Sequence, residues 1–121
     1  MSMNQCNFSG RLTNDPETRH FEGRGDKPGG SVTTFSIAVN RRFTVGGDKR
    51  DDVQYPRFKA FGKLGETIAK HFQKGKEIIL LARFEEERWE KEGEKRSRPV
   101  FVVSDFEFTG DRATASEGSD G

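Results

Sequence analysis

This sequence of 121 residues contains one cysteine, two histidines and one tryptophan, and its longest apolar run is the segment IILLA at 78–82. One cysteine excludes an internal disulfide and a thiolate metal cluster. His20 and His71 lack the spacing of a zinc site. The apolar run is too short to cross a membrane, and the chain does not open with the pattern of a secretory signal. We therefore expect a cytoplasmic protein that contacts no membrane and needs no metal or cofactor.

The sequence also lacks a strong excess of either charge, since its formal net charge is +1. Residues 1–110 contain 20 Lys and Arg against 17 Asp and Glu, whereas the last eleven residues contain one Arg and three acids. A chain without a strong overall field must contact a polyanion through a local basic stripe. The size and the 31% hydrophobic content indicate one domain with a small core.

Alternation of apolar and polar residues predicts three strands, a helix and two further strands. We expect strands over 6–12 (continued by 17–21), 31–43, 53–61, 77–89 and 100–108, and a helix within 62–75. Polar segments at 44–52 and 90–99 are typical of hairpin tips. This order predicts an all-β fold, a five-stranded OB-fold barrel with one helix between strands three and four. The predicted domain covers residues 1–109, and residues 110–121 are predicted to form a short disordered tail.

Side-chain periodicity also predicts which residues face the core. The strand residues expected on core-facing sides are Cys6, Phe8, Leu12, Phe35, Ile37, Val39, Val100, Val102, Phe106 and Phe108. Leu64, Ile68 and Phe72 lie four apart on one helical stripe, and Gly75 suits the C-terminal cap of that helix.

The segment VQYPRFKAFGK at 53–63 carries the strongest functional pattern. Phe58 and Ala60 can pack into a core. The other face of the strand then carries Tyr55, Arg57, Lys59 and Phe61, which places two cations between two aromatic rings. Cations between exposed rings fit single-stranded nucleic acid, because rings stack on bases and cations contact the phosphates between them. Packing against a neighbouring subunit is the alternative for this stripe.

Two further aromatic residues lie in charged surroundings, Phe43 after two arginines and Trp89 in the segment EEERWEKEGEK. They are candidates for rings that clamp a base. The structural alternative is that both rings plug the ends of the barrel.

Several segments together resemble bacterial and phage single-stranded DNA-binding proteins. They are GRLTNDPE (10–17), FSIAVNRRF (35–43), FGKLGETIAKHFQKG (61–75) and RFEEERW (83–89). The resemblance extends from about Asn4 to Phe108. It implies an OB fold, usually a homotetramer, that coats single-stranded DNA without sequence preference, with stacking residues at Phe43, Tyr55, Phe61 and Trp89.

This chain departs from that family's pattern in three respects. Many members have Trp at the positions of Phe43 and Tyr55, and some have His at a subunit contact where Pro56 stands here. Members usually end in an acidic tip with Pro-Phe that recruits replication and repair proteins, whereas this sequence ends in GSDG. Recruitment of such proteins is therefore not expected from this sequence.

We interpret the chain as a non-catalytic protein that binds and protects single-stranded DNA in replication, recombination and repair, and that forms a homo-oligomer. The residues predicted to contact phosphates are Arg41, Arg42, Arg57, Lys59 and Lys63. The alternatives are an OB-fold protein-interaction module of a replication-restart complex, an RNA-binding OB protein, and a metal-dependent nuclease using the glutamates at 85–87. The last is disfavoured because consecutive strand residues alternate faces, which leaves these carboxylates paired with Arg83 and Arg88.

Overall fold

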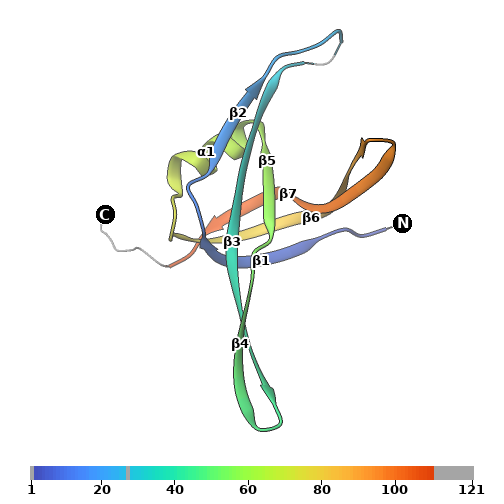
Figure 1. Cartoon of the computed structure of the whole chain (residues 1–121). Coiled ribbons are helices and arrows are strands. Elements are labelled where there is room, and N and C mark those ends of the chain that lie inside the picture. Colours follow the sequence, from blue (N-terminus) through green and yellow to red (C-terminus); the bar gives the residue numbers. More distant parts are fainter. Residues whose placement is uncertain (1, 27, 111–121) are drawn as a thin grey trace.

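The computed structural model describes residues 2–26 and 28–110 (Figure 1). The elements in chain order are β1 (Cys6–Leu12), β2 (Glu17–Phe21), β3 (Gly30–Val45), β4 (Asp48–Gln54), β5 (Arg57–Phe61), α1 (Gly62–His71), β6 (Glu77–Lys91) and β7 (Glu94–Phe108). Apart from Gly110, the predicted tail at 110–121 lies outside the described residues.

The strands close into a barrel. The hydrogen-bonded order is β1-β6-β7-β5-β3-β2, and an additional pairing of β1 with β3 closes the ring of β1, β6, β7, β5 and β3. The pairs are antiparallel except that of β5 with β7. With the helix between β5 and β6, this arrangement confirms the predicted five-stranded OB fold. The β3–β4 hairpin projects from the barrel as a long arm, and the end of the β6–β7 hairpin forms a second one (Figure 1).

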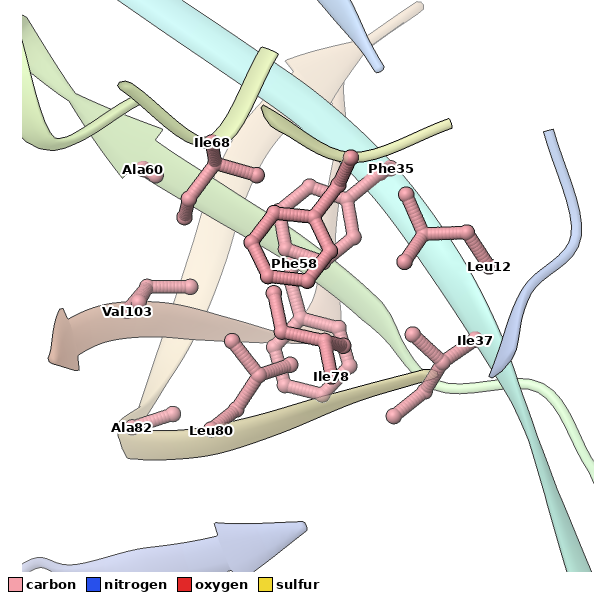
Figure 2. Packing of buried hydrophobic residues seen from close by; sticks show 11 residues of the cluster. Leu12, Phe35, Ile37, Phe58, Ala60, Ile68, Ile78, Leu80, Ala82 and Val103 are labelled. Atoms are coloured by element: carbon pink, nitrogen blue, oxygen red, sulfur yellow. The ribbon is translucent and has the colours of Figure 1, made fainter. Parts of the chain in front are cut away.

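The core fills the barrel with side chains from every second strand position. Phe35, Ile37, Phe58 and Ala60 are buried, as predicted, and they lie together with apolar residues of β1 and β6 (Figure 2). The helical stripe is also confirmed, because Ile68 and Phe72 belong to the core and Leu64 packs against it. The helix ends at His71 with Phe72 as its C-cap, so the prediction of Gly75 as the cap was wrong. Gly75 lies in the following turn with a φ of 90° and donates its amide hydrogen to the Leu12 carbonyl.

The hairpin arms are longer than the sequence predicted. The segments 44–52 and 90–99 were expected as loop tips, but only Gly46-Gly47 and Glu92-Gly93 leave the strands. All four residues have positive φ, as a two-residue hairpin turn with a tight right-handed twist requires. Conversely, the strand predicted over 53–61 is interrupted between β4 and β5 at Pro56, which has no amide hydrogen for a ladder.

The predicted core face of the last strand is interrupted by a bulge: Val100 and Val102 are buried, as predicted, whereas Phe108 is 53% exposed. The register of β6 with β7 shifts between Leu81 and Ala82, so Ala82 pairs with Val103 and Leu81 with Asp105. The extra residue is Ser104, and such a bulge moves the side chains that follow to the opposite face. Val103 therefore joins the core cluster, and Phe101 and Phe106 pack against it. Val100 and Val102 are buried outside that cluster.

Gly10 lies where β1 bends from its pairing with β6 to its pairing with β3. A β-carbon at this position would lie 2.4 Å from the backbone oxygen of Ala38, closer than any real contact. The absence of a side chain at Gly10 therefore allows the barrel to close.

We expect Gly10→Ala to lower the free energy of unfolding by about 1–3 kcal/mol, the usual cost of overpacking a site that cannot yield. Urea unfolding followed by circular dichroism would measure it. The matched control is Gly110→Ala, because a β-carbon there meets nothing within 4 Å and φ is not positive. Equal midpoints for the two variants would contradict the close approach at Gly10.

Candidate nucleic-acid interface

The outer face of β5 carries the predicted basic and aromatic stripe. Phe58 and Ala60 point into the barrel, and Arg57, Lys59 and Phe61 alternate with them on the outside. Phe61 is 49% exposed, so its ring is accessible to a ligand. Across the sheet these three residues pair with Ser36, Thr34 and Val32 of β3. The stripe therefore borders two small polar side chains and one valine of β3.

A groove with a volume of about 530 Å³ lies over this surface. Its walls come from β2, β3, β5, β6 and β7. The charged residues that line it are Arg19, Arg57, Lys59, Arg98, Glu17 and Glu87. Four cations against two carboxylates give the groove a positive balance in a protein whose net charge is only +1. Two of its four cations, Arg57 and Lys59, belong to the stripe that the sequence predicted.

Trp89 is joined to the groove by a chain of contacts. The Arg98 guanidinium lies 5.4 Å from the centre of the Trp89 ring. The same guanidinium donates a hydrogen bond to Glu87 at 2.8 Å, and Glu87 in turn forms an ion pair with Lys59. Glu87 and Arg98 are register partners on β6 and β7, and Trp89 lies two residues after Glu87 on β6. The side chains of Glu87, Trp89 and Arg98 therefore share one face of the hairpin. The ring of Trp89 is 41% exposed, so one side of it can accept a base.

A second hollow, of about 460 Å³, lies against Trp89 itself. Its basic lining residues are Arg88, Lys95 and Arg96. Glu90 also lines this hollow, and Arg88 and Arg96 form ion pairs with Glu86 and Glu94.

Phe43 and Tyr55 lie outside the groove. Phe43 lies on the β3–β4 arm, half-buried, with the Arg41 guanidinium 4.8 Å from its ring centre. Tyr55 stands between β4 and β5 and is 63% exposed. The four predicted stacking rings, Phe61 and Trp89 included, all lie outside the lining of the groove, as do Arg41, Arg42 and Lys63. Arg42 instead pairs with Asp51 across the arm, and Lys63 is exposed on α1.

Arg19, Glu87 and Arg98 are groove residues that the sequence prediction did not select. Arg98 was grouped with a hairpin tip, and its partnership with Glu87 depends on a register that the polar sequence of the arm does not indicate. Arg19 reaches the groove because β2 pairs with β3, which places Arg19 opposite Val32. A period-two pattern in ETRHF was the one available signal for Arg19.

The glutamates at 85–87 do not converge. Glu85 pairs with Arg83 and Glu86 with Arg88, as predicted, whereas Glu87 turns into the groove. Within residues 2–26 and 28–110, no group of three or more His, Cys, Asp or Glu side chains is arranged to hold a metal ion. The helix in this part of the chain is also too short and too polar to span a membrane.

Comparison with known families decides the identity of the chain. The model of the single-strand binding protein family matches residues 3–109. The chain belongs to this family. Among its relatives, the single-stranded DNA-binding protein of Clostridium perfringens is 34% identical, with 98% of this chain and 74% of that protein covered. That of Fusobacterium nucleatum is 36% identical over 94% of this chain and 71% of its own length.

Solved structures of family members share the fold. The single-stranded DNA-binding protein of Thermus aquaticus, solved as a deletion mutant, superposes with a TM-score of 0.78 at 28% identity, over 92% of this chain and 52% of that one. A Plasmodium falciparum protein solved in complex with single-stranded DNA has the same TM-score at 19% identity, over 90% of this chain and 96% of that one, a likeness of fold alone. The family predicted from the sequence is therefore confirmed.

Proposed function

We propose that this protein binds single-stranded DNA along the groove and the two arms. Bases stack on Trp89 and Phe61 beside the groove, and on Tyr55 and Phe43 toward the β3–β4 arm. The residues assigned to phosphates are Arg41, Arg42, Arg57, Lys59, Lys63 and Arg98. The relatives named as single-stranded DNA-binding proteins support the ligand class.

One observation carries this proposal: an exposed indole ring is continuous with a cationic groove through Arg98, Glu87 and Lys59. Along a single strand, bases and phosphates alternate at short intervals, so rings and cations must share one surface. Stacking contributes about 1–3 kcal/mol per base and is tolerant of sequence, because every base has a π-face. A duplex keeps its bases stacked on one another and offers no free face to Trp89.

The proposal predicts that oligothymidine quenches Trp89 emission and that duplex DNA does not. Trp89 is the only tryptophan, so the signal reports this ring alone. Binding should weaken with salt, since each contacted phosphate releases counterions. With roughly five phosphates contacted, log K would fall with log salt at a slope of about −3.5. A titration at several salt concentrations measures both effects.

Absence of quenching with weak, shallow binding would contradict the proposal and favour the protein-interaction module. Equal response to oligouridine would leave the stacking mechanism in place and broaden the ligand to RNA. Product formation with a divalent metal would instead support the nuclease.

We further propose that the chain forms a homo-oligomer, with a tetramer as the family implies, and acts in the cytoplasm in replication, recombination and repair without catalysing a reaction. Ile79 and Phe84 on β6 are about two-fifths exposed, and Met3 nearly fully so. Exposed apolar side chains lie beside the first part of β1, where residues 6–10 pair with β6 and the pairing with β3 has not begun, and they suit a contact with a second copy. Light scattering coupled to size exclusion measures the number of copies.

A further inference from the structure

Glu87 is a carboxylate that lines the groove we assign to phosphates. It forms ion pairs with Lys59 and with Arg98, the latter at 2.8 Å. The side chains of Glu87 and Lys59 are 25% and 30% exposed, so this pair is partly shielded from water. Two of the four cations that line the groove are thus already bound to an anion of the protein itself.

A phosphate would need the same donors. Carboxylate and phosphate oxygens both accept charge-assisted hydrogen bonds from ammonium and guanidinium groups. Lys59 Nζ and Arg98 Nε both donate to Glu87, so a phosphate can occupy the position between these two atoms only after those contacts break. The carboxylate of Glu87 would then lie beside the negatively charged phosphate, which disfavours binding.

We propose that Glu87 is an affinity-determining residue, an internal carboxylate that holds the phosphate position between Lys59 and Arg98 until a DNA phosphate displaces it. This inference rests on the proposed function. It assigns to Glu87 a role opposite to that of the cations around it, because Glu87 lowers affinity. It also couples two parts of the site, since the Arg98 that Glu87 holds is the one that lies against the Trp89 ring.

The test is the pair of variants Glu87→Gln and Glu86→Gln. Both remove one negative charge with little change in shape, at adjacent positions of β6 that face opposite sides. Glu86 lies outside the groove and is paired with Arg88, which lines the second hollow beside Trp89. Each variant therefore loses one negative charge and releases ion-paired cations near the ring, and their difference isolates the position between Lys59 and Arg98.

We expect Glu87→Gln to bind labelled oligothymidine about threefold to tenfold more tightly than Glu86→Gln at low salt, the range given by one or two partly exposed ion pairs. The difference should shrink as salt rises, because screening weakens the competition of Glu87 for its cations. Fluorescence anisotropy measures the dissociation constants, and circular dichroism verifies the fold of each variant. Glu87→Ser removes the same charge and replaces Glu87→Gln if that variant does not fold.

The inference would be overturned if the two glutamine variants bound equally tightly, or if Glu87→Gln bound more weakly. The proposed function would still stand in that case, provided that the unaltered protein bound DNA tightly. Failure of the unaltered protein to bind at any salt concentration would overturn both. The two failures are therefore distinguishable in one experiment.

Discussion

Trp89→Ala is expected to weaken the binding of single-stranded DNA about tenfold to a hundredfold, the loss of one stacked base. The ring lies on the β6–β7 arm, outside the core cluster, and 41% of it is exposed. Its contact with Arg98 is a cation–π interaction, which contributes only about 0.5–1 kcal/mol at an exposed site. The free energy of unfolding should therefore change little. Anisotropy of a labelled oligonucleotide and urea unfolding measure the two quantities.

Trp89→Phe is the conservative control for that experiment. A benzene ring keeps a face for stacking and for Arg98, so most of the affinity should return. If Trp89→Ala and Trp89→Phe bind equally well, an aromatic ring at this position adds nothing to affinity and the stacking role is wrong. Unchanged affinity together with a large loss of stability would mean that the ring closes the barrel, the alternative that the sequence left open.

The barrel was predictable because the strands that build it alternate cleanly. In β3 and β5 the apolar residues recur at every second position, and this pattern alone places Phe35, Ile37 and Phe58 on the core face. The arms were not predictable, because their strands are polar on both faces and are held by backbone pairing across two-residue turns. The bulge at Ser104 was also hidden, since VFVVSDFEF can be aligned with a core in either phase.

The site was predictable only where it lies on the barrel. Arg57, Lys59 and Phe61 follow from the alternation of β5, whereas the partnership of Glu87 with Arg98 depends on the turn at Glu92-Gly93. A turn one residue longer or shorter would place Arg98 on the face of the hairpin opposite to Glu87. Apolar residues fix the register of a strand whose face is buried, but nothing in the polar sequence of this arm does so.

Phe58→Ala is expected to cost about 3–5 kcal/mol of stability, a large part of the marginal total of a small domain. The Phe58 ring is 1% exposed and lies 5.1, 5.5 and 5.7 Å from the ring centres of Phe8, Phe35 and Phe101. Removing it leaves a cavity surrounded by rigid rings on three other strands, which cannot move together to fill the space. In urea unfolding, the midpoint concentration of Phe58→Ala should lie well below that of the unaltered protein.

Phe61→Ala is the matched comparison, because the same substitution is made three residues away on the same strand. Its ring is 49% exposed, so most of the affinity should be lost with little loss of stability. Phe58→Ala should behave in the opposite way: well below its unfolding midpoint, the folded fraction should bind DNA almost as tightly as the unaltered protein. This opposition follows from the alternation of β5, which directs one ring to the core and the other to the ligand. If both variants lost affinity at full folding, packing inside the barrel would set the geometry of the groove, and the two faces of β5 could not be treated as independent.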